Sequence, residues 1–255
     1  MPVHPLFENR KVGQELTLES RSLTLSAQLV AEVRQALFER RLSPGDHLGG
    51  EKEIAARMGV SRIVARDALR TLEAMGIVEI RVGSGGGARI AQGNPRRIAE
   101  ALAVQLELIG TDVAEIMDAQ RAVECLAAEL AAEHATKEDF ARLRALNAQA
   151  EHLLEDVTGF TTNGAEFHLA VAAASHNRAL VVQLQSLQHV SWPSRNPTLT
   201  RDVAEHVLQA HRDLTRLIET RDPTAARQLM DAHVKMIRAR RVAEHGDPGF
   251  VNACC

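Results

Sequence analysis

Three histidines in the second half of the chain have the residue type and the surroundings of a metal site. His168 lies in AEFHLAVAAASHN, His211 in HVLQAHRDLTRLIETRD and His233 in AARQLMDAHVKMI, each among apolar residues on a predicted helix. Three neutral imidazoles that converge in a helical core can bind Zn²⁺ or Ni²⁺ and leave coordination positions open. An ordinary hydrogen-bonded or surface role stays open for each histidine.

A second stretch of interest, residues 51–75, is predicted to form two short helices separated at Gly59. Apolar side chains recur at helical spacing on both sides of this glycine. The residues expected to pack are Ile54, Ala55 and Met58 in the first helix and Ala65, Ala68, Leu69, Leu72 and Met75 in the second. Two helices with so short a connection are typical of a helix-turn-helix, whose second helix enters the major groove of DNA.

Arginines follow the opposite face of the second of these helices. Arg62, Arg66 and Arg70 are four residues apart, and Ser61 is a good N-cap that places Arg62, Ile63 and Arg66 near the helix start. An arginine in this position can bind guanine through two hydrogen bonds. An arginine-striped surface helix of any soluble protein has the same pattern, and this segment alone does not separate the two interpretations.

The residues that follow predict a β-hairpin. Residues 77–81 alternate apolar and charged side chains, GSGGG at 83–87 is rich in residues that tolerate positive φ, and 88–91 can return as a second strand. The order of helix, turn, helix and hairpin is that of a winged helix-turn-helix, with Arg81 and Arg89 beside the wing tip. A nucleotide-binding P-loop is the weaker alternative, because GSGGG lacks the Lys-Ser/Thr ending and opens no helix.

The first half of the chain resembles the GntR regulators of bacteria. The resemblance rests on LSPGDHL at 42–48, Glu51, GVSR at 59–62, RDAL at 66–69 and Gly76. It implies a winged helix-turn-helix in which the residues matching family positions that contact operator DNA are Lys52, Ser61, Arg62, Arg66 and Gly83. To these the residue pattern adds Ile63, Arg70 and Arg89 as DNA-binding candidates.

Two departures from the family pattern concern the same domain. Gly49-Gly50 stands where a Pro-Ser cap is usual, which weakens the cap of the first short helix. Arg89 replaces an apolar wing residue and offers an additional phosphate contact.

The second half resembles the helical FCD effector domain of the FadR-type branch of the same family. The matching pieces are RAVE at 121–124, FH at 167–168 with ASHN at 174–177, His211 with Asp222, and Ala226 with His233. In metal-binding members of that family three His and one Asp hold a divalent metal under the effector pocket. The resemblance assigns the three His positions to His168, His211 and His233.

The expected Asp, one helical turn before His168, is Gly164 in this chain, and Glu166 should point elsewhere. We therefore expect a divalent metal, Zn or Ni, held by three His with water or an effector carboxylate, and weak binding or a metal-free pocket stay open. Arg121 is the expected partner of an anionic effector, and its alternative is a structural pair with an acid. Trp192 either closes the pocket or packs.

Composition and charge support two domains with different partners. The chain has 255 residues, 45% apolar and only 3% aromatic, so Ala, Leu and Val must form its cores, which favours helices. Residues 1–98 carry 15 Lys and Arg against 11 Asp and Glu, and residues 99–255 carry 15 against 22. The basic first half suits DNA, and the acidic second half should stay away from it.

No apolar stretch resembles a signal peptide or a membrane span, so we expect a cytoplasmic protein. The three cysteines, Cys125, Cys254 and Cys255, do not have the pattern of a disulfide framework or of a zinc ribbon. Cys125 is expected on the packed side of a helix.

The expected organisation is a flexible leader (1–21), a winged helix-turn-helix domain (22–91), a linker (92–97), an all-helical effector-binding and dimerisation domain (98–245) and a tail (246–255). The first domain should begin with a helix over 22–40 and a turn over 42–48. The predicted helices of the second domain are 98–109, 112–134, 137–156, 163–174, 177–190, 200–220 and 223–244, with breaks at Gly110, Thr136, Gly159 and Asp222-Pro223. The fold class is mostly α with a small β-hairpin wing.

These features together predict a ligand-responsive transcription regulator, not an enzyme. We expect a repressor that binds a pseudo-palindromic operator in double-stranded DNA as a homodimer and responds to a small organic acid bound in the second domain. Two other interpretations stay open at this stage. One is a metal-dependent enzyme that uses a three-His site, and the other is a DNA-binding protein without an effector.

Overall fold

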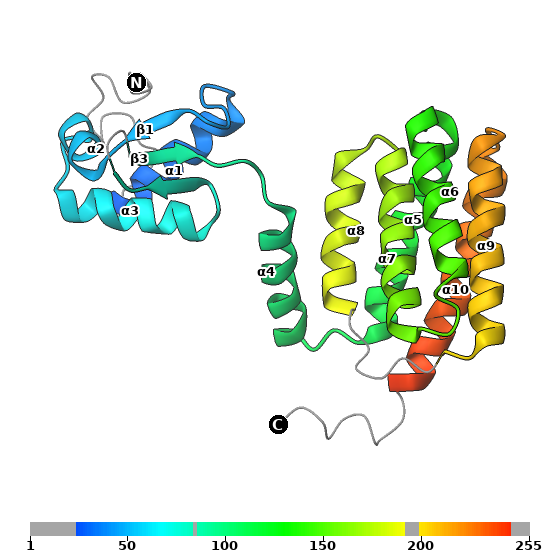
Figure 1. Ribbon diagram of the computed structural model, residues 1–255. Helices are drawn as coiled ribbons and strands as arrows, with labels where there is room; N and C mark the ends of the chain where they lie inside the picture. The colour runs from blue at the N-terminus through cyan, green and yellow to red at the C-terminus, as the bar shows by residue number, and fades with distance from the viewer. Residues whose placement is uncertain (1–23, 84–85, 192–198, 246–255) are drawn as a thin grey trace. The chain divides into compact units, whose positions relative to one another are not determined.

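The computed structural model describes residues 24–83, 86–191 and 199–245 (Figure 1). The chain divides into two compact units, Met1–Asn94 and Pro95–Cys255, and each is described by itself. Within the described ranges, ten helices and three short strands confirm the expected fold class. Among these helices, none combines the length and low polarity that crossing a membrane requires. The expected leader and tail, Trp192, Cys254 and Cys255 lie outside the described residues.

The first unit places three helices around a small sheet. Its elements are α1 (Leu25–Phe38), β1 (His47–Gly49), α2 (Glu51–Met58), α3 (Arg62–Ala74), β2 (Val78–Arg81) and β3 (Gly87–Ile90). Its buried core includes Leu29, Val33, Leu48, Ile54, Met58, Ala68 and Leu72. The packing face expected for α2 and α3 is therefore confirmed, apart from Met75. Met75 is 48% exposed because it lies at the C-cap of α3, where the helix leaves the core.

The two short helices begin and end as their sequence predicts. Gly59 ends α2 in the left-handed region at φ 64°, where a glycine has no Cβ to strain. The Ser61 hydroxyl accepts a hydrogen bond of 3.2 Å from the Val64 N–H and caps α3. Gly50, the weak cap noted above, is compensated in part because its own N–H donates to Glu53 at 2.8 Å.

Replacing Ser61 with alanine should destabilise the start of α3 by about 1 kcal/mol, because one backbone N–H loses its partner. Hydrogen exchange measured by mass spectrometry should show faster exchange in peptides that cover α3. Thr136→Ala is the matched control, since Thr136 caps α6 in the other unit. Unchanged exchange in α3 would mean that packing alone holds this helix start.

The sheet has one strand more than the expected hairpin. Its order is β1-β3-β2, with antiparallel pairs on both sides of β3. The segment expected as a turn over 42–48 thus ends in β1, a strand too short to show an alternating pattern. Gly87 has φ 116°, and a Cβ there would lie 3.0 Å from the Gly49 backbone. One glycine of the wing is therefore required for the close approach of β1 to β3.

The second unit is a bundle of helices that lie beside one another (Figure 1). Its elements are α4 (Pro95–Leu108), α5 (Val113–His134), α6 (Lys137–Glu151), α7 (Val157–Ala174), α8 (Arg178–Ser191), α9 (Arg201–Glu219) and α10 (Pro223–His245). Helix α5 packs along α10 and also contacts α7, α8 and α9, so it is central to the bundle. Alanines such as Ala128, Ala131 and Ala174 are fully buried and let the helices approach closely.

Several boundaries differ from the sequence expectation. Helix α1 begins at Leu25 rather than at residue 22, and α4 begins at Pro95, inside the expected linker over 92–97. Helix α6 ends at Glu151, not at residue 156. Gly159 is not a break, because it lies in the first turn of α7 and donates its N–H to Asp156 at 3.0 Å. Local capping and not glycine content decides where α7 begins.

Candidate metal centre and DNA-reading helix

Helix α3 has one buried face and one exposed basic face. Ala65, Ala68 and Leu69 are buried, and α3 packs against α1 and α2. The other face exposes the predicted DNA-binding residues Arg62, Ile63, Arg66 and Arg70, with Asp67 exposed beside them. Ile63 is 78% exposed and lies on the same face as the arginines. This face can offer both hydrogen bonds to bases and an apolar contact to a thymine methyl group.

Arg66 is held by a residue of the preceding helix. Its Nε and Nη2 atoms donate to the two carboxylate oxygens of Glu51 on α2, both at 2.8 Å. These hydrogen bonds are the main cause that lowers the pKa of the Glu51 carboxyl below its usual value, with further help from Arg62 and Arg70. Sequence reasoning missed this pair because the two residues are 15 positions apart. The Nη1 edge of the guanidinium takes no part in the pair.

The other DNA-binding candidates differ in their exposure and in their contacts within the first unit. Lys52 is exposed in the first turn of α2, and Gly83 has φ 106°, a conformation that favours glycine. Arg81 lies beside the wing with its side chain 65% exposed. Arg89 donates from Nη1 to the Gly45 carbonyl at 3.2 Å. The phosphate contact expected of Arg89 therefore competes with a contact inside its own unit.

The three predicted metal-ligating histidines lie together in the core of the second unit. His168 on α7, His211 on α9 and His233 on α10 are 7%, 2% and 5% exposed. His233 Nε2 lies 3.2 Å from His211 Nε2 and 3.3 Å from His168 Nε2. One ligand atom from each ring lies within 4.8 Å of the others. The Nε2 atoms of three histidines on three different helices thus lie close together.

This convergence fits a cation. A neutral imidazole carries a single N–H, so His233 Nε2 cannot donate fully to both neighbouring nitrogens at once. Burial, followed by the neighbouring imidazoles, lowers the pKa of His211 well below its usual value. Burial and then His168 lower the pKa of His233 to about 3. Both rings are therefore neutral near pH 7, which is the form that binds a metal ion.

A buried carboxylate that sequence reasoning did not single out lies behind one of these rings. Glu124 on α5 is 1% exposed, and its Oε2 is 2.6 Å from His168 Nδ1. The two atoms are in close contact, and neither makes a hydrogen bond of regular geometry in the structure. Gln120 Nε2 donates to the other oxygen at 2.7 Å. Glu124 ends the RAVE segment at 121–124, and its position along the chain does not indicate a contact with His168.

Gly164 lies next to the same cluster. A Cβ built there would be 3.9 Å from His211 Cε1, with no closer neighbour. His211 stacks on Phe167, with ring centroids 4.1 Å apart, so its imidazole is fixed in place. A Cβ at this position would therefore make only an ordinary van der Waals contact beside the histidines, and the protein supplies no anionic ligand from it.

Arg121, the predicted effector-binding residue, forms an ion pair with a residue of α10. Its Nε donates to Asp231 at 2.6 Å, and Lys235 also contacts this carboxylate at 2.6 Å. Asp231 and His233 are two residues apart on α10, so their side chains point in different directions. Cys125, on the packed side as expected, has a pKa raised to about 11 chiefly by burial. The Asn177 side chain accepts hydrogen bonds from the N–H groups of Ala179 and Leu180 and caps α8.

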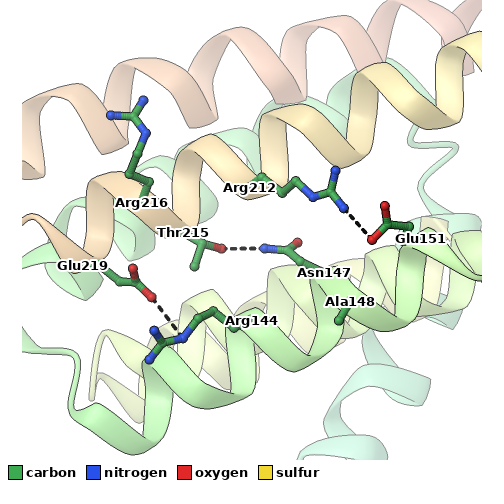
Figure 2. A pocket seen from close by; sticks show the side chains of 8 residues that line it. All are labelled: Arg144, Asn147, Ala148, Glu151, Arg212, Thr215, Arg216 and Glu219. Atoms are coloured by element: carbon green, nitrogen blue, oxygen red, sulfur yellow. Dashed lines mark hydrogen bonds and ion pairs between the residues drawn. The ribbon is translucent and has the colours of Figure 1, made fainter.

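A surface groove of about 310 Å³ lies between α6 and α9 (Figure 2). Its arginines are paired, Arg144 with Glu219 at 3.4 Å and Arg212 with Glu151 at 2.9 Å. At its base Asn147 Nδ2 donates to Thr215 Oγ1 at 2.9 Å, and Thr215 donates to the His211 carbonyl. The lining carries three arginines and two glutamates, and the third arginine, Arg216, pairs with Asp213 at 3.3 Å. The hydrogen bonds at the base of the groove support the helical turn that carries His211.

Comparisons with known proteins agree with both units. Residues 25–87 match the family model "Bacterial regulatory proteins, gntR family", and residues 115–236 match the FCD domain. The Uxu operon transcriptional regulator of Escherichia coli K12 is 29% identical over 82% of this chain and 84% of its own. The Exu regulon transcriptional regulator of the same strain is 28% identical over 90% and 89%. A solved GntR structure from Streptococcus agalactiae, 24% identical, covers 84% of this chain and 99% of its own with a TM-score of 0.60, which supports the fold.

A winged helix-turn-helix with a basic exposed helix face, joined to a helical domain with a buried cluster of metal-type ligands, defines a DNA-binding transcriptional regulator with an effector domain. The chain belongs to the gntR family of bacterial regulatory proteins, and its second unit is an FCD domain. This family and these relatives consist of regulators. The prediction that the protein is not an enzyme is therefore confirmed, and the three-His metalloenzyme is not supported.

Proposed function

We propose that the protein is a cytoplasmic repressor that binds a pseudo-palindromic operator as a homodimer and is released by a small organic acid. The observation that carries the DNA-binding part is the exposed face of α3, where Arg62, Ile63 and Arg66 follow the Ser61 cap. Lys52, Arg70, Gly83 and Arg89 complete the proposed DNA contact residues. A homodimer follows from the two-fold symmetry that such a motif uses to reach two half-sites.

The effector would bind in the FCD domain near the three histidines. We propose that His168, His211 and His233 hold a divalent metal, Zn or Ni, and that a carboxylate of the effector completes its coordination. Three close, buried nitrogen donors and the absence of a side chain at Gly164 support this arrangement. Arg121 would bind the effector only if its ion pair with Asp231 broke and the effector carboxylate took the place of Asp231. Trp192 remains a proposed effector contact. The FCD domain is also the ground for placing the chain in the FadR branch.

Regulation requires that the effector bind one arrangement of the DNA-binding heads better than the other. A metal held by the three histidines would connect α7, α9 and α10. An acid that binds to this metal can favour one packing of the three helices over another. Its differential affinity for the two arrangements would then change the operator affinity of the dimer by linkage. An effector with equal affinity for both arrangements would have no effect, whatever its strength of binding.

The test uses the full-length protein and duplexes selected from a random library. The selected duplex should contain an inverted repeat and should be bound by a dimer in sedimentation experiments. Metal-loaded protein should then release it in the presence of a small carboxylate, found by thermal stabilisation in an acid panel. Selection of an inverted repeat without release by any acid would support the effector-independent interpretation. Failure to select any sequence would remove the operator proposal itself.

Glu51→Gln should weaken discrimination between the selected duplex and random DNA, by a smaller factor than loss of Arg66 itself. The neutral side chain holds Arg66 less firmly, so the base contact weakens, while loss of one negative charge favours phosphate binding on any sequence. Fluorescence anisotropy with both duplexes over a salt series measures both effects. Glu53→Gln is the control, because Glu53 bonds the Gly50 N–H instead of Arg66. An equal gain on both DNAs would show that Glu51 acts only through charge.

A further inference from the structure

We propose that Glu124 supplies the negative charge that the three-His ligand set lacks. A divalent ion held only by three imidazoles brings its full charge into a core where charges are poorly solvated. The position from which an aspartate could balance it is Gly164, which has no side chain. This inference rests on the proposed metal site and names the residue that makes such a site tolerable in this chain.

Glu124 is placed for this role by burial and distance. It is 1% exposed, and its Oε2 lies 2.6 Å from Nδ1 of His168, a ring that is itself 7% exposed. The opposite ring atom, Nε2, lies 3.3 Å from His233 Nε2 in the cluster. A carboxylate at Nδ1 favours the tautomer with the proton on that atom and leaves the Nε2 lone pair for a metal. The charge therefore acts through the imidazole.

Other carboxylates near this part of the bundle are already used elsewhere. On the contact between α5 and α10, Asp118 pairs with Arg238, Asp231 with Arg121 and Glu129 with Arg227. These three acids are 29–49% exposed at their side chains. Of the aspartates and glutamates in the described ranges, Glu124 alone is buried. It is also held on its second oxygen by Gln120, so its position is fixed.

The experiment compares Zn²⁺ affinity in four full-length proteins by competition with a chromophoric chelator at neutral pH. The proteins are the wild type, Glu124→Gln, Gly164→Asp and the double variant. Glu124→Gln keeps the shape and removes the charge, and should weaken Zn²⁺ binding by about 10–100-fold. Gly164→Asp places a new anion beside the histidines. In the double variant it should restore affinity to within about threefold of the wild type, because one anion replaces the other.

Each outcome has a distinct meaning. A wild type that binds neither Zn²⁺ nor Ni²⁺ would remove the proposed metal site itself. A wild type that binds Zn²⁺ with an equally tight Glu124→Gln variant would overturn the role of Glu124 alone. A Glu124→Gln loss that Gly164→Asp does not reduce would also overturn it, because the missing quantity would not be charge. Glu129→Gln, which removes a half-buried carboxylate of the same helix that pairs with Arg227, should bind Zn²⁺ like the wild type.

A measurement on the wild type covers the case in which Glu124→Gln does not fold. Nitrogen-15 NMR of the histidine rings reports which ring atom carries the proton and which binds the metal. Because Glu124 lies beside Nδ1 of His168, the proposal predicts that His168 keeps its proton on Nδ1 and binds Zn²⁺ through Nε2. Zn²⁺ bound through Nδ1 of His168 would overturn the inference, since the carboxylate would then face the metal side of the ring.

Discussion

His233→Ala is expected to abolish stoichiometric metal binding. His233 Nε2 lies between His211 Nε2 and His168 Nε2, at 3.2 Å and 3.3 Å, so its removal leaves two ligands without their common neighbour. Protein purified without a chelator or a histidine tag should contain near-stoichiometric metal, and the variant less than about a tenth of that amount. Elemental analysis measures both, and thermal unfolding with added Zn²⁺ should show stabilisation of the wild type alone.

The control for this substitution is His134→Ala. His134 ends α5 with its side chain 53% exposed and is not one of the three clustered histidines. Its loss should leave the metal content unchanged. If His233→Ala retained its metal while His134→Ala lost it, the ion would sit outside the buried cluster. A metal-free wild type would instead mean that Gly164 marks a lost site, and the effector search would start from Arg121.

Arg66→Ala is expected to cost about 1–3 kcal/mol in binding of the selected operator, because a bidentate contact to a base is lost. The variant should also narrow the affinity gap between operator and random DNA. The substitution leaves Glu51 unpaired on the same surface, which adds repulsion toward DNA phosphates. Fluorescence anisotropy with both duplexes at several salt concentrations separates the base contact from this general charge effect.

Arg34→Ala provides the matched control for Arg66→Ala. Arg34 is an exposed arginine on α1 of the same unit and is not among the proposed DNA contact residues. It removes one positive charge without touching a proposed base contact, so any loss should be small and equal on both DNAs. An Arg66→Ala variant that behaved the same way on both DNAs would make Arg66 a phosphate contact. Base reading would then rest on Arg62 and Ile63.

Local patterns predicted the elements well where short-range physics decides them. Ser61 and Asn177 cap helices because their side chains reach backbone N–H groups three residues away or closer. Gly59 and Gly110 lie where helices end in the left-handed region. The error at Gly159 has the same origin, because Asp156 caps α7 before the glycine and the helix continues through it.

Long-range pairings were not predictable in the same way. Strand β1 exists because β3 pairs with it, and its three residues have no pattern of their own. The partner of Arg66 is 15 residues away, and the partner of Arg121 is 110 residues away. Spacing within one helix could show which face Arg121 shares, but not which of several acids on other helices would lie opposite it.

The sequence by itself determined the two-domain order, the helical class, the basic face of α3 and the three histidines with the missing aspartate at Gly164. These features follow from residue types at helical spacing and from family motifs, which act over a few residues. Only the tertiary structure decided that the three histidine nitrogens meet, that Glu51 holds Arg66 and that Glu124 lies behind His168. Such contacts depend on how separate helices pack and rotate against one another, and each helix leaves that rotation undetermined until its partners are in place.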